Sequence, residues 1–527
     1  MCALRLTMRR LKKEALEPVE NVKPKRKRQR TREKDEEPTG AVLPSPYHTF
    51  CDPANVAYLR THLLSWYDLE KRELPWRTLA LREPDVNIRT YAVWVSEIML
   101  QQTQVATVMD YYIKWMKRWP TVSDLAAATL EEVNQMWAGL GYYSRGKRLH
   151  EGAKKVVSEL GGQMPGTVDE LLRQLPGVGR YTASAIGSIA LGQVTGAVDG
   201  NVIRVLCRMR AIGADCTSPA VTEALWALAN TLVDQKRPGD FNQAMMELGA
   251  RVCTPKRPLC EQCPVRSQCH SYRKVQAKLE QNSKRLFGKM DTKPAATLPD
   301  IEDCSADGLC PLCPREPWDE ELGAQNFPRK PAKKPPRRER TLTCVLTRRG
   351  ERGEEEFLLM QRPNKGLLAG LWEFPSLLLE EEERSEKKHK TALCEHLSKH
   401  LRAPLIDCSL HYVGEVLHIF SHIHQIYVVY ALDLGDDEAP PPMGDLRWIS
   451  RLALQESAVS TGVKKIVKLY ESASLQKERN TPDATRQKDD GKKRPRGTKK
   501  GKMKTSSRSN KQLSVSSFFR STKQEPC

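Results

Sequence analysis

The fold is decided by two short stretches of sequence, Leu175-Pro-Gly-Val-Gly-Arg-Tyr-Thr-Ala183 and Val198-Asp-Gly-Asn-Val202. Segments with the helical spacing of apolar residues flank the first stretch, which therefore predicts a helical hairpin. Gly177 and Gly179 let the backbone come close to a partner. The amides that open the second helix carry partial positive charge and form a phosphate site. A bare helix connection without a ligand is the alternative interpretation.

The predicted hairpin helices span 168–175 and 181–191, and Asp199 is placed to open a third predicted helix, 201–210. Asp is among the best N-cap residues, so Asp199 in one interpretation only caps this helix. The capping amides also keep a carboxylate ionised, which is what a developing cation needs. A phosphate site next to this carboxylate favours chemistry on a nucleotide over simple binding.

The composition indicates a multidomain protein with real hydrophobic cores. The chain has 527 residues, of which 39% are hydrophobic. No apolar run approaches the ~20 residues that span a bilayer, so we expect a soluble protein without membrane contact.

The net charge of +20 is concentrated in the two tails. Residues 1–32 carry a surplus of nine positive charges and residues 471–527 a surplus of ten, which leaves one for the middle. Both tails have a disordered composition. The basic runs 23–30 and 492–496 resemble nuclear localisation signals, while the acid-free segment 1–13 is a weaker mitochondrial indication. We therefore expect a nuclear protein with a mitochondrial alternative.

Four cysteines, Cys253, Cys260, Cys263 and Cys269, follow the spacing C-x6-C-x2-C-x5-C. No signal peptide is recognisable, so metal binding is a better use for the 15 cysteines than disulfides. Four thiolates this close together hold either a tetrahedral zinc ion or a cubane iron–sulfur cluster. The spacing alone does not choose between the two.

The hairpin, the aspartate and the cysteine spacing together resemble the helix-hairpin-helix DNA glycosylases with a [4Fe–4S] cluster, a superfamily that includes endonuclease III and MutY. The resemblance covers roughly 63–269. It implies a six-helix barrel and a cluster domain with the active site between them, and a structural or DNA-sensing cluster. Lys256 and Arg257, in the first cysteine loop, then become DNA phosphate contacts; a solvated basic loop is the alternative.

Tyr181 distinguishes between two types of reaction in this superfamily. In lyase-type members of the superfamily a lysine stands at this place and attacks the sugar through a Schiff base, which a phenol cannot form. The resemblance therefore implies a monofunctional glycosylase, with a bifunctional glycosylase/lyase as the rival. The stretches 94–105 and 137–145 resemble the MutY signature, which implies adenine removal opposite 8-oxoguanine or guanine in double-stranded DNA.

Two carboxylates in different surroundings suit this chemistry. Glu97 lies on a helical segment crowded with apolar residues, where desolvation raises its pKa and keeps a proton available for adenine. Asp199 stays ionised and stabilises the sugar cation. The two residues are the expected catalytic pair; a solvated glutamate near a helix start is the alternative for Glu97.

The resemblance assigns four further residues. Tyr181 and Asn201 line the sugar side, while Gln102 and Tyr142 fill or wedge the duplex when adenine is flipped out. Tyr142 could equally belong to the core, as aromatic residues usually do.

Residues 276–340 have the composition of an interdomain connector and contain Cys304, Cys310 and Cys313. Three thiolates need a fourth ligand to complete a zinc site. By resemblance this ligand is His48, and His270 is the competitor. The connector is also a place where other repair proteins could bind.

The second half of the chain predicts an α+β domain. The expected strands and helix are 342–346, 356–361, 411–416, 424–431 and, as a helix, 388–401. Segments 361–363, 368–375 and 420–422 resemble the C-terminal Nudix-like domain of MutY, which implies that Phe420, Ser421 and His422 read 8-oxoguanine. The acidic run 380–390 lacks the order of a Nudix hydrolase box, so pyrophosphate hydrolysis is not expected.

Near the end of the chain, Gln512, Val515, Phe518 and Phe519 resemble a sliding-clamp peptide, with Val515 in the place of a more usual Leu, Ile or Met. Chance aromatic residues in a disordered tail are the alternative.

The expected fold is thus an all-α helix-hairpin-helix glycosylase followed by an α+β Nudix-like domain, in a monomer with disordered basic tails. The predicted domains are 1–45 (basic arm), 46–275 (glycosylase with the cluster segment 253–269), 276–340 (connector), 341–470 (Nudix-like domain) and 471–527 (tail). A Nudix pyrophosphatase and a damage-binding scaffold without activity are the more distant rivals.

Overall fold

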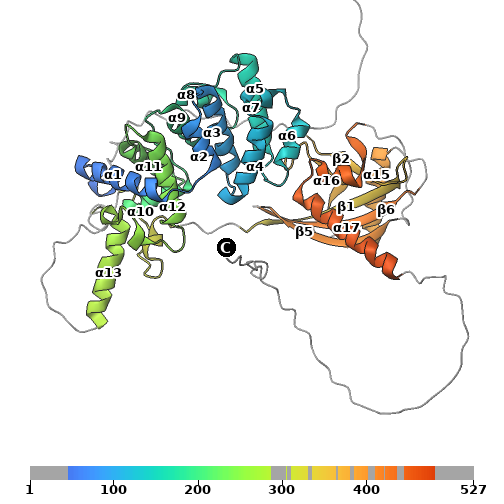
Figure 1. The fold of residues 1–527 in the computed structure, drawn as a ribbon. Helices are drawn as coiled ribbons and strands as arrows, with labels where there is room; N and C mark the ends of the chain where they lie inside the picture. Colours follow the sequence, from blue (N-terminus) through green and yellow to red (C-terminus); the bar gives the residue numbers. More distant parts are fainter. Residues whose placement is uncertain are drawn as a thin grey trace, which may run out of the picture. The chain divides into compact units, whose positions relative to one another are not determined.

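The fold was analysed in a computed structural model of the chain. It describes residues 45–286, 304, 310–329, 335–363, 366–379, 385–401, 410–420, 422–435 and 444–480. A helical part precedes an α+β part, and each is described by itself (Figure 1). This order of fold classes confirms the sequence prediction. None of the helices in these ranges has both the length and the apolar character needed to cross a membrane.

The helical part is built from helices, and short loops join those from α1 to α9 (Figure 1). In chain order they are η1 (Pro46–His48), α1 (Pro53–Glu70), α2 (Pro75–Arg82), α3 (Val86–Leu100), α4 (Val105–Arg118), α5 (Val122–Ala127), α6 (Leu130–Trp137), α7 (Ser144–Glu159), α8 (Val168–Gln174), α9 (Arg180–Leu191), α10 (Gly200–Met209), α11 (Pro219–Leu232), α12 (Pro238–Arg251), η2 (Cys260–Gln262), η3 (Arg266–Gln268), α13 (His270–Leu286) and η4 (Gly323–Asn326).

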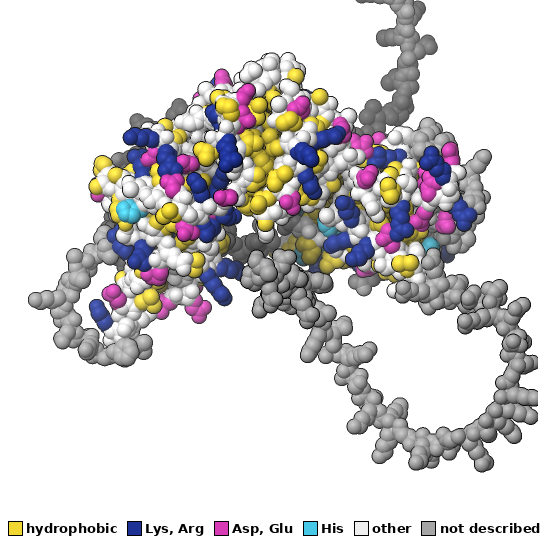
Figure 2. All heavy atoms as spheres, in the orientation of Figure 1, with side chains coloured by type: hydrophobic (Ala, Val, Ile, Leu, Met, Phe, Trp, Pro, Cys, Tyr) yellow, Lys and Arg dark blue, Asp and Glu magenta, His cyan; other side chains and the backbone are white. Residues whose placement is uncertain are grey.

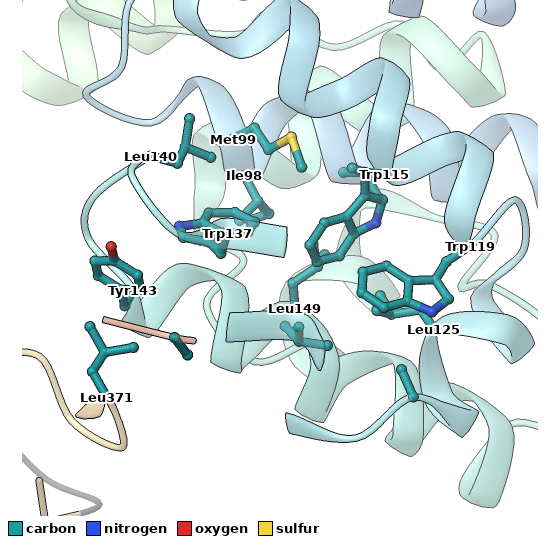
Figure 3. Close-up of a cluster of buried hydrophobic side chains, with 14 of the residues drawn as sticks. Ile98, Met99, Trp115, Trp119, Leu125, Trp137, Leu140, Tyr143, Leu149 and Leu371 are labelled. Atoms are coloured by element: carbon teal, nitrogen blue, oxygen red, sulfur yellow. The ribbon is translucent and has the colours of Figure 1, made fainter. Parts of the chain in front are cut away.

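Helix α3 is the central helix of the first core. Every residue from Thr90 to Met99 is buried, because α2, α4, α7 and α9 all pack around this helix. Large aromatic side chains fill the space beside it, among them Trp115 and Trp137, which lie edge to face (Figure 3). Since a helix that is apolar on all faces is buried, α3 carries any polar side chain into the interior of the domain.

A second core forms where α1, α10, α11 and α12 meet. Helix α10 has apolar residues on one face, and Val202, Val205 and Leu206 are buried there. Helix α13 continues to Leu286, beyond residue 275, where the sequence places the start of the connector.

The hairpin of the sequence prediction is present as α8 and α9. The predicted bounds of α8 and α9 each differ from the observed ones by one residue at one end, whereas α10 lies one residue earlier than predicted at both ends. Gly179 and Asp199 are N-caps, so α9 and α10 begin directly after them. In the turn Gly177 has φ 78°, and a Cβ there would come within 2.9 Å of the Arg148 side chain. This position therefore requires glycine.

The α+β part contains one sheet with helices (Figure 1). Its elements are β1 (Arg337–Arg349), β2 (Glu355–Gln361), β3 (Trp372–Glu373), β4 (Ser376–Leu379), α15 (Glu386–Leu401), β5 (His411–Ile419), β6 (Ile423–Asp433), β7 (Leu446–Ser450), α16 (Arg451–Glu456) and α17 (Thr461–Asn480).

The strand order is β3-β2-β1-β6-β5, with β4 paired to β1 and β7 paired to β2. Strands β1 and β6 are parallel, and their register runs from Arg337↔Ile423 to Thr347↔Asp433. The prediction of 342–346 for the first strand is too short. Apolar runs mark the buried middle of a strand, whereas its length here follows from pairing with β6.

Charged side chains do not form one patch on the face drawn in Figure 2, where Lys and Arg are interspersed with Asp and Glu over the helical part. This agrees with the small net charge of the middle of the chain.

Candidate active site and metal-binding clusters

A cavity of about 590 Å³ lies at the meeting point of α2, α3, α9, α10 and α12. This volume is within the range of ligand-binding pockets. Its lining includes Arg72, Trp76, Arg77, Glu97, Gln102, Tyr181, Asp199, Asn201, Gln243, Met246 and Glu247. Glu97, Tyr181, Asp199 and Asn201, which the sequence analysis places in one site, thus face a single cavity.

Glu97 lies in the last turns of α3 and is 5% exposed. The interpretation of Glu97 as a solvated residue near a helix start is therefore wrong. The Tyr181 hydroxyl donates a hydrogen bond to Glu97 Oε2 at 2.8 Å. Burial, opposed by this hydrogen bond and reinforced by the charge of Asp199, raises the pKa of Glu97 to about 7. The carboxyl group is therefore protonated to a large extent at neutral pH.

Asp199 is the N-cap of α10. Its Oδ1 accepts hydrogen bonds from the amides of Asn201 at 2.9 Å and Val202 at 2.7 Å, and its Oδ2 accepts one from Asn201 Nδ2 at 2.8 Å. Donors and a helix N-terminus both favour the ionised carboxylate. The capping and catalytic interpretations are thus compatible, since Asp199 caps α10 and also lines the cavity.

Tyr181 lies in the first turn of α9, and its hydroxyl also contacts Met246 Sδ at 3.6 Å. Burial and the nearby charges of Glu97 and Asp199 raise the pKa of this phenol well above its ordinary value. Among the described residues that line the cavity there is no lysine. The site therefore offers an acid and an anion but no amine.

The sequence analysis missed a buried ion-pair network at the same cavity. Glu247 on α12 is 1% exposed and accepts hydrogen bonds from Arg72 Nε at 2.6 Å and Arg77 Nη2 at 2.8 Å. Although burial alone raises the pKa of Glu247, the two arginines outweigh it and hold the pKa below its ordinary value. The sequence contains one signal for this network, because the carboxylate of Glu247 lies among the apolar residues that form the buried face of α12.

The two residues expected to wedge the duplex are both exposed and lie in turns. Gln102 follows α3 and Tyr142 precedes α7. Both adopt the left-handed backbone region, with φ 53° and 48°. Because Tyr142 is 44% exposed, the alternative of a core aromatic is wrong.

The start of α9 fits the expected anion site. Gly179 makes no side-chain cap there, so the first amides of the helix have no side-chain acceptor at this end. Lys256 and Arg257 are both exposed in the loop after Cys253.

The four cysteines of the first cluster line one small cavity together with Arg208. Arg208 Nη1 lies 3.4 Å from Cys253 Sγ and donates at 2.7 Å to the Thr254 carbonyl. Burial raises the pKa values of Cys263 and Cys269 to about 12, so as bare thiols they stay protonated. Four thiol groups around one small space are the donor set that an iron–sulfur cluster requires.

The second cluster brings together His48, Cys304, Cys310 and Cys313, whose ligand atoms all lie within 4.8 Å of one another. His48 Nδ1 is 2.7 Å from the Arg210 carbonyl, so it carries the proton and leaves Nε2 free as a ligand, 3.3 Å from Cys313 Sγ. This cysteine and histidine cluster is consistent with metal binding.

His270, the competing ligand, fits this site less well. Its Nε2 lies 2.8 Å from Arg210 Nη1, which donates to it. Among the described residues, the group of ligand atoms within 4.8 Å of one another also includes His48 and not His270.

The expected 8-oxoguanine loop lies at the tip of the β5–β6 hairpin. Phe420 donates its amide to the Ile423 carbonyl at 2.8 Å and its ring lies edge to face with His418. His422 is exposed, while Ser421 lies outside the described residues. The expected clamp peptide, with Gln512, Val515, Phe518 and Phe519, also lies outside them.

The chain is similar to known proteins over most of its length. A family model described as "HhH-GPD superfamily base excision DNA repair protein" matches residues 95–231, and one described as "NUDIX domain" matches 345–469. The adenine DNA glycosylase of Mus musculus is 55% identical over 430 residues, which cover 81% of this chain and 80% of the mouse protein. That of Homo sapiens is 56% identical over 431 residues, 81% of this chain and 76% of the human protein.

Among solved structures, one described as the complex between the C-terminal domain of mouse MUTYH and human PCNA is 39% identical. The match covers 26% of this chain and 90% of the chain in the solved structure, with a TM-score of 0.23. The identity over four fifths of the chain, together with the helical and NUDIX matches, assigns the family. The chain belongs to the adenine DNA glycosylases of base excision repair, the MutY homologues.

Proposed function

We propose that this adenine DNA glycosylase is monofunctional and acts on adenine opposite 8-oxoguanine or guanine in double-stranded DNA. The observation that carries the proposal is the pair of unlike carboxyl groups at one cavity, a buried Glu97 with a raised pKa and a capping Asp199. Paired titratable groups in opposite environments mark the acid and the anion of such a reaction.

In the proposed reaction Glu97 donates its proton to N7 of the flipped adenine as the bond between the base and the sugar breaks. The sugar becomes an oxocarbenium-like cation, which Asp199 stabilises on the opposite side. Water then adds to the sugar carbon, and the proton that it gives up returns the Glu97 carboxylate to its neutral form. Neutral adenine and an abasic site are the products.

The cavity lining also combines polar and apolar groups. Arg72, Arg77 and Glu247 form a polar ion-pair network on one side, and Trp76 adds an apolar aromatic surface. Such mixed lining of apolar and placed polar groups is typical of ligand sites.

Tyr181 supports hydrolysis over the lyase reaction, because a Schiff base needs an amine and no described lysine lines the cavity. Borohydride reduction during turnover distinguishes the two reactions. We expect no covalent enzyme–DNA adduct, and an adduct in good yield would favour the bifunctional alternative.

The tip of the β5–β6 hairpin is proposed to recognise the base opposite adenine. Phe420, Ser421 and His422 would read 8-oxoguanine there. Support comes from the aromatic ring of Phe420 and the exposed imidazole of His422, which lie at the connection between β5 and β6. Replacing Phe420 and His422 together by alanine is expected to equalise the rates for adenine opposite 8-oxoguanine and opposite guanine. Unchanged discrimination would exclude this role.

For the first cysteine cluster we propose a [4Fe–4S] centre held by Cys253, Cys260, Cys263 and Cys269. When bound, it would tie the segment 253–269 into a fixed loop. That loop presents Lys256 and Arg257 to DNA phosphate.

For the second cluster we propose a zinc ion held by His48, Cys304, Cys310 and Cys313, since three thiolates and a neutral imidazole suit tetrahedral zinc. Its role is to fix the connector to the helical part. Metal analysis of the purified protein is expected to give one zinc per chain, and H48A is expected to lose it while keeping iron. Equal zinc content in H48A would contradict the ligand assignment.

We further propose a monomeric nuclear protein, with a mitochondrial fraction, that binds a sliding clamp through Gln512, Val515, Phe518 and Phe519. Support comes from the sequence alone, namely the basic runs and two aromatic residues in a polar tail. The connector is the proposed surface for other repair proteins. Loss of clamp binding in a Phe518→Ala, Phe519→Ala variant tests the clamp peptide.

The experiment that tests the whole proposal is a single-turnover reaction on a duplex with adenine opposite 8-oxoguanine, followed by alkali cleavage at abasic sites. We expect one cleaved strand at the adenine, faster than with adenine opposite guanine. Binding without base release would favour a scaffold, and Mg²⁺-dependent release of phosphate products from oxidised nucleotides would favour a pyrophosphatase.

A further inference from the structure

Arg145, the first-turn residue of α7, is a buried arginine that the proposed reaction leaves without a role. It is 7% exposed, and among the described residues it forms no ion pair with a carboxylate. Burial lowers the pKa of Arg145 to about 10, so the guanidinium is still charged at neutral pH. A buried charge is costly unless several partners compensate for it.

The partners of Arg145 are the carbonyl groups of two turns. Nη1 shares its hydrogens among the carbonyls of Ile98 at 3.0 Å, Met99 at 2.8 Å and Gln101. These groups belong to the last turn of α3 and the residue after it, where helix carbonyls have no partner within the helix. A cation is also favoured at a helix C-terminus. Arg145 therefore caps α3 from another helix.

The other nitrogen reaches the second turn. Nη2 donates to the Gly141 carbonyl at 2.9 Å and to Thr103 Oγ1 at 3.1 Å. The guanidinium carbon also lies 5.4 Å from the centre of the Tyr142 ring and 5.3 Å from that of Trp137. One planar group thus joins the turn that carries Gln102 to the turn that carries Tyr142.

Both turns hold their exposed residue in a conformation that a side chain disfavours. Gln102 has φ 53° and Tyr142 has φ 48°. A non-glycine residue in this region costs on the order of 1–3 kcal/mol and persists where its surroundings fix it. The carbonyl on one side of each residue, Gln101 or Gly141, is a hydrogen-bond acceptor of Arg145.

The packing around Arg145 leaves it little freedom. A Cβ at Gly146 would come within 2.8 Å of the Trp137 ring, so the first turn of α7 is pressed against that ring. Trp137 Nε1 donates to the Gly141 carbonyl at 3.0 Å. Figure 3 shows Trp137 and Leu140 beside Ile98 and Met99 at this place.

We infer that Arg145 is a positioning residue that sets Gln102 and Tyr142 together as one preformed wedge for extruding adenine from the duplex. The inference rests on the proposed DNA roles of these two residues. A rigid wedge lowers the cost of ordering two loops at the moment of binding. A lysine cannot replace Arg145. The planar guanidinium places several N–H donors toward two turns at once, whereas an ammonium group is a single point of charge.

The test compares R145M and R145K with the wild-type protein in single-turnover reactions on two substrates. One is the duplex with adenine opposite 8-oxoguanine. In the other the same adenine faces an abasic-site analogue, so that extrusion breaks no base pair. On the first we expect a loss of about 30-fold, which corresponds to roughly 1 kcal/mol of backbone strain at each of two residues. On the second we expect a loss below about threefold.

R89M is the matched control, because Arg89 also donates to backbone carbonyls, those of Ala190 and Glu83, away from both turns. We expect similar rates from R89M and the wild type on the two substrates. Equal losses of R145M on both substrates, or a shift of its pH profile, would overturn the inference, since Arg145 would then act on Glu97 or on folding.

A double-mutant cycle with Y142A separates this inference from the proposed function. If Arg145 acts through the wedge, R145M costs much less in the Y142A background than in the wild type. A wild-type rate for Y142A would exclude the proposed role of Tyr142. An impaired Y142A with a normal R145M would exclude the positioning role alone.

Discussion

Glu97 near the end of α3 and Asp199 at the start of α10 are carboxyl groups that face the same cavity from opposite kinds of surroundings. Glu97 is enclosed by a helix whose residues are all buried from Thr90 to Met99, and a phenol is its hydrogen-bond donor. Asp199 receives two backbone amides and a side-chain amide at a helix N-terminus. The same functional group is thus buried beside a single phenol donor in one place and held by three amide donors in the other.

The two carboxyl groups nevertheless depend on each other. The charge of Asp199 is one of the causes that raise the pKa of Glu97, after burial. The anion that suits the sugar cation therefore also helps the acid to keep its proton.

Removing either carboxyl group should abolish adenine release. E97Q removes the proton donor and D199N removes the anion, and we expect each rate to fall by about 10³-fold or more, because general acid catalysis and charge stabilisation each contribute on this order. Single-turnover cleavage measures the rate, and duplex affinity should stay near that of the wild type. D215N is the control, since Asp215 also accepts from a backbone amide, that of Thr217, but lies outside the cavity. Normal turnover by E97Q or D199N would refute the assignment.

The same E97Q substitution should stabilise the fold at alkaline pH. The folded state holds the Glu97 proton up to a pKa of about 7, whereas the unfolded chain loses it near 4.5. The wild type therefore loses stability as pH rises from about 4.5 to 7, by roughly 3 kcal/mol, and glutamine avoids this loss. Thermal unfolding should give E97Q a melting temperature several degrees higher at pH 8 and a small difference at pH 5. A difference that does not change with pH would mean that Glu97 is ionised in the folded state.

The rate of base release should fall as pH rises above about 7. Ionisation of Glu97 removes the proton that adenine needs, so a tenfold loss per pH unit is expected on the alkaline side. Single-turnover rates between pH 5.5 and 9 measure this limb. A constant rate up to pH 9 would show that another group supplies the proton.

How much of this site the sequence could predict depends on the range of the interactions. Asp199 was identified because an N-cap is a local feature. Glu97 was identified because the stretch 94–105 resembles the MutY signature, and its apolar neighbours then predicted the raised pKa. The network of Arg72, Arg77 and Glu247 was missed, since its partners come from α2 and α12, far apart in the chain. No spacing rule connects them before the fold is known.

The same limit applies to the fold. The hairpin α8–α9 follows from local glycines and apolar spacing, and its bounds were predicted almost to the residue. Strand β1 was predicted too short, because its outer residues are fixed by the parallel pairing with β6. Arg145 appeared in the sequence as part of a signature, but its carbonyl acceptors in two turns could not be foreseen.

The smallest expected effect concerns the phenol that touches the acid. Tyr181 donates to Glu97 Oε2, and this hydrogen bond opposes burial by lowering the pKa of Glu97. Y181F should therefore move the alkaline limb of the pH–rate profile upward, by less than one unit, because burial and the charge of Asp199 remain. Profiles of Y181F and the wild type, measured side by side, give the shift. A limb that moves to lower pH would mean that the phenol stabilises the protonated acid, and the contrast between the two carboxyl groups would then rest on Tyr181 as well as on burial.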